Sequence, residues 1–440
     1  MKWYLGIATA VVTFMLSGKP LSAQQRADTT AGGQQRALDS LAAVVRATQA
    51  RLDSLERAMA AAPATPQARA PGAYMNVSFV GLTDLGWSST PDVGSLQVGD
   101  HDPKVRGFSI PNAELVFDGA VDPYFKAFTA IVYKIDENGE TGVELEEMFL
   151  LSTALPKNLQ LKVGQFFTEF GRQNQQHPHA WAFADQPLVL NRMFGPEGLR
   201  SQGARVSWLL PTSWYTEAMV SVLNSAGGTA FSFRSDESGE IHGGVTSERS
   251  VAGAGDMLYV PRIVTSLEPT DNQVLLVGAS GAYGPNNSGP RAHTSILGTD
   301  VYWKWKSPYA HQGFPFVSFQ GEYLTRSYGT GARGYLDNPI TNIAGETLED
   351  NGAYAQVLWG IQPRVVAGFR AEYVNADENA FVSPERQDRT RWSPDLTWYP
   401  SEFSKLRLQY NYDRRPGLRD EHSVWVQFEF LLGAHAAHKF

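Results

Sequence analysis

The sequence of 440 residues contains no cysteine, which excludes disulfide bridges, thiolate metal sites and cysteine nucleophiles. Basic residues are in the minority: 37 Lys and Arg stand against 45 Asp and Glu, for a formal net charge of −8. A chain of this charge gives no reason to expect nucleic-acid binding. Beyond its first residues the chain also lacks any apolar run of the length that a transmembrane helix needs. The sequence therefore predicts no membrane-spanning helix.

The N-terminus has the parts of a secretory signal peptide. Lys2 supplies a positive charge, residues 4–16 (YLGIATAVVTFML) form a short apolar core, and the stretch SGKPLSA ends at Ala23. The apolar core is too short to span a bilayer. We therefore expect residues 1–23 to be removed and the protein to be exported.

Residues 24–60 are predicted to contain an N-terminal coiled-coil helix, because apolar residues between 34 and 60 recur at alternating steps of three and four. The seam consists of Leu38, Leu41, Val45, Thr48, Leu52, Leu55 and Met59. The alternative is a single amphipathic helix packed against another part of the protein. Residues 61–72 (AAPATPQARAPG) form a Pro/Ala-rich linker without a packing pattern.

From residue 73 to residue 440 the dominant period is two, which indicates β-strands. Residues 404–413 (SKLRLQYNYD) carry leucines and tyrosines on one face and polar residues on the other. Such strands suit either a soluble sandwich or a barrel with an apolar face toward lipid. We predict sixteen strands, near residues 73–83, 105–118, 121–134, 142–153, 158–169, 201–210, 213–223, 256–266, 272–283, 295–305, 314–327, 351–360, 364–374, 389–398, 403–413 and 421–431.

The connections between these strands favour the barrel. Every second connection is short and holds a proline, whereas most of the others are longer and rich in Gly, Ser, Asn and Asp. Short turns at one rim and long loops at the other are typical of outer-membrane barrels. Aromatic pairs at the short turns, such as Trp398 and Tyr399, fit an interfacial girdle. The expected fold is an all-β, sixteen-stranded antiparallel transmembrane barrel in the outer membrane of a Gram-negative-type bacterium.

The third long connection, residues 171–200, is unusually rich in aromatic and other large apolar residues. A sixteen-stranded barrel leaves an open aqueous lumen. We expect this loop to fold inward and narrow the lumen, anchored by Trp181, Phe183 and Phe194. The alternative is a surface loop that packs on its neighbours.

Three segments resemble the phosphate-selective porin O and P family: residues 161–181 (LKVGQFFTEFGRQNQQHPHAW), 190–211 (LNRMFGPEGLRSQGARVSWLLP) and 122–133 (DPYFKAFTAIVY). The resemblance implies a trimeric outer-membrane channel for anions, in which basic residues line a constriction formed by the third loop. The order of strands and loops resembles that family over the whole barrel, and the resemblance of the residues themselves is specific over about a quarter of it.

The strand face opposite the apolar one is expected to line the lumen. Its basic residues, with those of the third loop, are the candidate pore and anion-binding residues: Lys126, Lys162, Arg172, Arg192, Arg205, Arg370, Arg389, Arg391, Lys405 and Arg407. Lys304 points inward on the same pattern, as do Asp300, Glu322, Glu372, Asp395 and Glu429. Fixed positive charge over a low-dielectric wall concentrates anions. The alternative is a structural mesh of ion pairs.

Two further features of the sequence bear on the site. In the fourth strand, Glu144, Glu146 and Glu147 cannot all point to water without a β-bulge. The histidine pairs His177/His179 and His435/His438 come without a placed carboxylate partner, so we predict no metal site and no cofactor.

The predicted function is passive diffusion of small hydrophilic solutes, leaning to anions such as phosphate, and no catalytic residues are assigned. The expected partners are outer-membrane lipid, the solutes and two further copies in a homotrimer. Two alternatives remain: a structural anchor that reaches the cell wall through the N-terminal helix, and a lipase-type enzyme using the segment SPYAHQ.

Overall fold

A computed structural model of the chain describes residues 75–136, 139–235, 239–244, 246, 250–334, 342–377 and 386–433. The predicted signal peptide, coiled-coil helix and linker lie outside the described residues, and so do His435 and His438.

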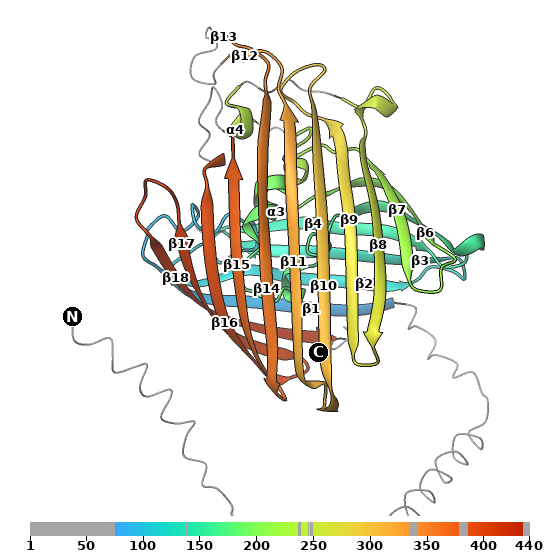
Figure 1. Ribbon diagram of the computed structural model, residues 1–440, viewed down its shortest axis with the longest axis vertical. Coiled ribbons are helices and arrows are strands. Elements are labelled where there is room, and N and C mark those ends of the chain that lie inside the picture. The colour runs from blue at the N-terminus through green and yellow to red at the C-terminus, as the bar shows by residue number, and fades with distance from the viewer. Residues whose placement is uncertain are drawn as a thin grey trace, which may run out of the picture. The chain divides into compact units, whose positions relative to one another are not determined.

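Sixteen antiparallel strands form a closed barrel in which β1 pairs with both β2 and β18 (Figure 1). This confirms the predicted fold class. The barrel strands are β1 (Met75–Ser88), β2 (Gly107–Ala120), β3 (Phe125–Ile135), β4 (Thr141–Ser152), β5 (Leu159–Phe167), β6 (Arg200–Leu209), β7 (Thr216–Leu223), β8 (Leu258–Thr270), β9 (Gln273–Pro285), β10 (His293–His311), β11 (Phe314–Gly329), β14 (Thr347–Gln362), β15 (Val365–Ala376), β16 (Arg389–Ser401), β17 (Ser404–Arg414) and β18 (Glu421–Gly433).

Short elements occupy the connections. They are the helices α3 (Leu188–Phe194) and α4 (Gly239–His242), the 3-10 turns η1 (Pro156–Asn158), η2 (Pro178–Ala180), η3 (Gly228–Ala230) and η5 (Ala254–Asp256), and the hairpin of β12 (Arg333–Gly334) and β13 (Asn342–Ile343). Among the described residues, no helix has the length and apolar character needed to cross a membrane.

Along most of each strand, apolar residues that point outward alternate with residues that point inward, and most of the inward residues are polar. In β16, Trp392 and Leu396 are exposed on the outside, whereas Arg391, Ser393 and Asp395 are buried inside. The exposed outer residues of the other strands are likewise large and apolar, and include many Leu, Val and Trp. A continuous apolar belt of this kind is unfavourable in water and matches the lipid-facing surface of an outer-membrane barrel. The protein is accordingly an outer-membrane barrel.

The two rims differ as expected. The turn between β10 and β11 has two residues, whereas the loop between β5 and β6 runs from residue 168 to residue 199. We call these rims the short-turn rim and the long-loop rim. One girdle assignment was wrong: Trp398 is exposed on the outside, but Tyr399 lies inside, beside Lys405. Consecutive residues of a strand point to opposite faces, so both could not meet lipid.

The fourth strand, in which Glu144, Glu146 and Glu147 cannot all point to water without a β-bulge, contains one. Ala130 pairs with Glu147 and Ile131 with Leu145, so Glu146 is the extra residue. Because of this extra residue, Glu146 and Glu147 are both buried on the inner side instead of alternating between the faces.

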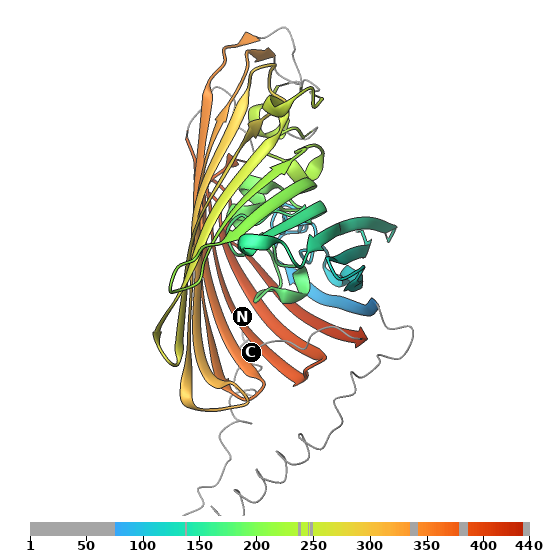
Figure 2. The same ribbon diagram turned by 90° about the vertical axis from the view of Figure 1, so that its right-hand side faces the viewer.

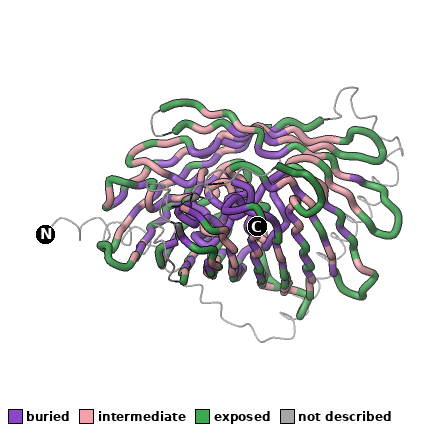
Figure 3. Tube along the Cα trace, turned by 90° about the horizontal axis from the view of Figure 1, so that it is seen from above, coloured by how far each residue is buried: buried purple, intermediate pink, exposed green. Residues whose placement is uncertain are grey.

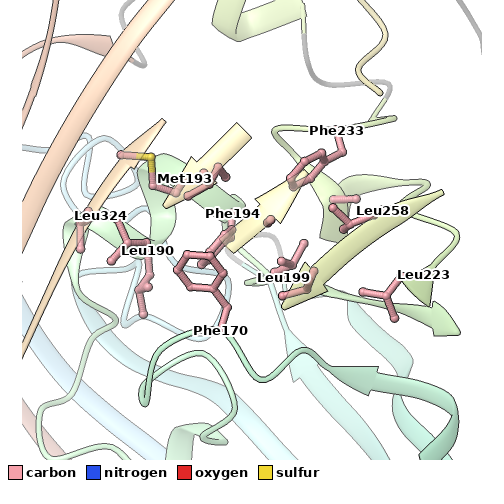
Figure 4. Packing of buried hydrophobic residues seen from close by; sticks show 14 of the residues in the cluster. Phe170, Leu190, Met193, Phe194, Leu199, Leu223, Phe233, Leu258 and Leu324 are labelled. Carbon is pink, nitrogen blue, oxygen red and sulfur yellow. The ribbon is translucent and has the colours of Figure 1, made fainter. Parts of the chain in front are cut away.

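The hydrophobic core lies inside the barrel, not between two sheets. Residues of the third long loop and of α3 pack against apolar side chains on the inner wall (Figure 4). The cluster consists of Phe166, Phe170, Leu188, Val189, Leu190, Met193, Phe194, Leu199, Leu223, Ala230, Phe233, Leu258, Val260, Ala282, Ile296, Leu324, Tyr354 and Val374. Viewed from above, the chain inside the barrel is largely buried, whereas buried, intermediate and exposed residues alternate along the wall (Figure 3). In side view, segments from the middle of the chain, coloured green, lie on the concave side of the curved wall (Figure 2).

Candidate functional site

The third long loop, residues 168–199, crosses the lumen and binds the opposite wall. The backbone N–H of Gly171 donates to Ser280 on β9 (3.1 Å), and that of Gln173 donates to Glu322 on β11 (2.7 Å). Gly171 has a φ of 60°, and a Cβ there would lie 2.1 Å from a Glu322 oxygen, so glycine is required for this approach. The predicted inward fold of the loop is confirmed.

The three predicted aromatic anchors are buried. Phe194 packs edge to face against Phe170, with ring centroids 5.1 Å apart. The Phe183 ring lies under the Arg370 guanidinium at 4.6 Å. Trp181 donates its indole N–H to the backbone oxygen of Gln176 (2.8 Å), which closes the loop on itself.

The tip of the loop is attached to β15–β17 by one carboxylate, Asp185. One carboxylate oxygen accepts from Arg370 (2.5 Å), and the other accepts from Arg391 (2.7 Å). Side-chain amides complete the set of donors: Gln97 (3.1 Å), Gln409 (2.7 Å) and Asn411 (2.8 Å). Asp185 therefore connects the loop to two strand arginines and to the first long loop.

Burial of Asp185 opposes its charged form. Arg370 and Arg391 outweigh that effect and hold the pKa of the carboxyl well below its usual range. Removing one partner of a buried ion pair leaves an uncompensated charge, at a cost of about 3–5 kcal/mol. Asp185 is thus the main electrostatic attachment of the loop to β15 and β16.

Other basic residues of this wall bind backbone carbonyls of the loops. Lys405 donates to the oxygen of His179 (2.6 Å), and Arg407 donates to the oxygen of Trp181 (2.8 Å). Arg389 donates to the oxygen of Leu96 (2.6 Å) in the first long loop. The third loop thus presents Asp185 and backbone carbonyl oxygens to this wall, because buried cationic side chains need acceptors.

A pocket of about 250 Å³ lies on the long-loop side of the third loop, and we call it the long-loop pocket. Its lining includes five arginines and a single acid, Glu240; the arginines are Arg192, Arg326, Arg386, Arg389 and Arg415. Asp350 lies 2.6 Å from Arg326, 3.1 Å from Arg386 and 3.4 Å from Arg192, so three arginines share this carboxylate. Burial lowers the pKa of Arg192 to about 10, against the opposing effect of Asp350. Arg192 is still a cation at neutral pH.

A second pocket of about 260 Å³ lies toward the short-turn rim, and we call it the short-turn pocket. Arg172, Lys304 and Lys405 line it, and its described lining residues include no Asp or Glu. Arg172 stacks over the Tyr302 ring at 4.0 Å and donates to Gln320 (3.1 Å). The two pockets therefore place separate groups of positive charge on either side of the third loop.

The remaining candidates lie apart from both pockets. Lys162 and Arg205 both ion-pair with Glu169 at the start of the loop, and Lys126 is exposed near the short-turn rim. Several interior residues were not predicted: Asp185, Arg326, Arg386, Arg415 and Arg262, which pairs with Asp300 (2.6 Å). Arg262 and Arg326 each lie two residues after an inward-pointing apolar residue of the same strand. Because side chains alternate between the two faces of a strand, the sequence could have predicted that both arginines point inward.

Two groups of side chains among the described residues are close enough to hold a metal ion. One consists of Glu114, Glu146 and His177, and the other of Asp100, His101 and Glu197. The first group contains His177, one member of the His177/His179 pair noted in the sequence, and the carboxylates missing there are supplied by β2 and β4.

Comparison with solved structures places this geometry among the porins. The anion-selective porin from Comamonas acidovorans aligns with a TM-score of 0.50 over 81% of this chain and 100% of its own, at 8% identity. The outer-membrane channel DcaP of Acinetobacter baumannii aligns with a TM-score of 0.50 over 81% and 97%, at 11% identity. At these identities the likeness shows the fold alone. The fold is that of an outer-membrane porin.

Sequence comparison gives a family without an assigned activity. No protein-family model matches the chain. An uncharacterised protein of Aquifex aeolicus (strain VF5) is 33% identical over 357 residues, which cover 76% of this chain and 70% of the relative. The chain belongs to the same family as this Aquifex protein.

Proposed function

We propose that the protein is an outer-membrane diffusion channel for small hydrophilic solutes that prefers anions, with phosphate as the leading candidate. The observation that carries the proposal is the pair of basic pockets on either side of the third loop. A solute that crosses the barrel passes from one pocket to the other along this loop.

The charges of the long-loop pocket support anion binding. Three arginines around Asp350 leave an excess of positive charge, although Arg386 also pairs with Asp377 (2.5 Å), which is partly exposed. Arginine presents several N–H donors in a plane that matches carboxylate and phosphate oxygens. Positive groups held over a low-dielectric wall raise the local concentration of anions.

The short-turn pocket supports the same preference by a different arrangement. The positive charge of Lys304 lies 4.6 Å above the Phe316 ring, and Arg172 lies over Tyr302. These cations rest on aromatic rings, which leave much of their hydrogen-bonding capacity for a solute. Of the basic residues predicted from sequence, we assign Arg172 and Arg192 to solute contact. Arg389 and Lys405 also line the pockets, but they pair with Asp413 (2.6 Å) and Glu429 (2.7 Å).

The choice of phosphate and the homotrimer rest on the resemblance to the phosphate-selective porin O and P family. Within this proposal Arg370, Arg391 and Arg407 position the third loop, because their donors are used by Asp185 and by loop carbonyls. The pore walls are thus formed by the two basic pockets, and the loop between them is held by ion pairs.

The test is the reversal potential of the full-length protein in planar bilayers across a potassium chloride gradient. We expect anion selectivity, and block of the chloride current by inorganic phosphate. Replacing Arg192 and Arg386 together by Gln should shift the reversal potential toward cations and weaken the block. Lys157→Gln removes one charge from an exposed turn outside the lumen and is the control. Absence of channels, or a double variant that behaves as wild type, would contradict the proposal.

A further inference from the structure

A buried group of histidines and glutamates joins the third loop to the wall opposite Asp185. His177, in the loop, lies between Glu114 on β2 and the bulged pair Glu146 and Glu147 on β4. Its Nδ1 is 3.0 Å from a Glu114 oxygen and 2.8 Å from a Glu146 oxygen, and its Nε2 is 2.8 Å from a Glu147 oxygen. The basic pockets do not include these four residues.

The orientation of the His177 ring is fixed by Glu147. One Glu147 oxygen accepts from His177 Nε2, and the other accepts the backbone N–H of Phe167 (2.8 Å). With its proton on Nε2, the imidazole directs the lone pair of Nδ1 toward the carboxylates of Glu114 and Glu146. A lone pair beside two carboxylate oxygens is repulsive unless a cation lies between them.

The surroundings of Glu146 also favour a cation at this position. Its side chain is 1% exposed, and neither of its oxygens accepts a hydrogen bond from the described residues. His177 Nδ1 also makes no well-directed hydrogen bond, although an oxygen of Glu146 lies 2.8 Å away. Burying a carboxylate without a hydrogen-bond donor or a cation is costly.

Two more histidines lie beside the carboxylates of Glu114 and Glu146. His179 Nδ1 lies 3.1 Å from the second oxygen of Glu114. His101 has Nδ1 at 3.2 Å from the Pro111 carbonyl, which leaves its Nε2 directed at the second oxygen of Glu146, 3.5 Å away. The second oxygen of each carboxylate is therefore next to a histidine.

We infer that His177 Nδ1, Glu114 and Glu146 bind a divalent transition-metal ion of the zinc class, with Glu147 holding the ligating imidazole. Imidazole with carboxylates suits zinc and its first-row neighbours better than calcium or magnesium. A carboxylate that accepts the other ring N–H of a ligating histidine is the usual outer partner of such sites. Donor atoms about a tetrahedral zinc ion lie roughly 3.3 Å apart, so these atoms need to separate by a few tenths of an ångström.

The ion fastens the third loop to β2 and β4, whereas Asp185 fastens it to β15 and β16. The competing arrangement is a doubly protonated imidazole. Burial opposes it, but Glu114 and Glu146 outweigh burial and raise the pKa of His177 well above its usual value. An ion and a second proton exclude each other at Nδ1, so metal content distinguishes them.

The experiment uses full-length protein extracted from outer membranes, stripped with a chelator and titrated with zinc chloride alone. We expect one zinc ion per chain and a rise in the melting temperature of the folded barrel as zinc increases. Glu146→Gln and His177→Gln should lose this zinc, and Glu147→Gln should weaken zinc binding about 10–100-fold. His293→Gln is the matched control, because His293 stacks on Tyr283 outside the group.

Wild-type protein that holds no zinc, or glutamine variants that bind zinc as wild type does, would overturn the inference. If the variants fail to assemble, X-ray absorption of zinc in the wild type decides: a ligand shell without imidazole contradicts the site. Channel currents are measured separately on the zinc-free protein, so failure of this site and failure of the proposed channel are distinguishable.

Discussion

The arginines around Asp185 and those around Asp350 have different surroundings on the same inner wall. Arg370 and Arg391 share Asp185, and each has a second carboxylate: Glu372 lies 2.8 Å from Arg370, and Asp413, which also pairs with Arg389, lies 3.0 Å from Arg391. At Asp350, one carboxylate serves three arginines beside a pocket, and of these Arg386 also pairs with Asp377. Residue type alone therefore does not separate a structural cross-link from a solute contact; the number of acids and the access to a cavity do.

The largest expected effect comes from removing the part of the loop that both groups of arginines surround. Replacing residues 176–190 by a short Gly/Ser linker should raise single-channel conductance several-fold, because the segment fills the lumen while the strand pairings of the barrel stay intact. Deleting residues 250–253, which are exposed in another long connection, is the control. Equal conductance of the two deletion variants would place the current path away from the third loop.

The substitution Asp185→Asn tests the group of arginines around Asp185, in which carboxylates balance the positive charges. The substitution leaves Arg370 and Arg391 with one carboxylate fewer, and we expect the folded barrel to lose about 3–5 kcal/mol. The readout is the temperature at which the folded band disappears in heat-modifiable gel migration. Glu402→Gln, in an exposed short turn, should leave that temperature unchanged. A variant as stable as wild type would show that the loop is held by its apolar packing alone.

The pH dependence of this attachment follows from the sign of the shift at Asp185. Its pKa in the folded protein lies below the usual value of 3.8, so the stabilisation is complete above that pH and is lost as the pH falls toward the folded pKa. The stability difference between wild type and Asp185→Asn should be constant from pH 7 to pH 5. Below about pH 4 it should shrink by up to about 1.4 kcal/mol per pH unit. A difference that already shrinks between pH 7 and 5 would assign the effect to another group.

The sequence predicted the wall better than it predicted the contents of the lumen. Alternation along each strand depends on neighbouring residues, so it predicted the sixteen strands and the inward direction of Arg370, Arg391 and Arg407. The role of Asp185 could not be read in this way, because its partners Arg370 and Arg391 come 185 and 206 residues later in the chain. Such pairings depend on the path of the loop, which has no period.

The smallest expected effect is the difference between replacing an arginine of the long-loop pocket and replacing an arginine that holds the third loop. Both arginines are buried; Arg386 lines the long-loop pocket, whereas Arg407 lines neither basic pocket and donates to Trp181 and Gln427. At about 0.1 M salt, charges act over roughly 10 Å, so both Arg386→Gln and Arg407→Gln should shift the reversal potential toward cations. At about 1 M salt the range falls to roughly 3 Å, and only a residue that touches the solute should still matter. We therefore expect the shift of Arg407→Gln to vanish at high salt while part of the Arg386→Gln shift persists. If the two shifts decline in parallel, selectivity comes from the summed field of the wall, and the excess of arginine at Asp350 gives no separate binding site.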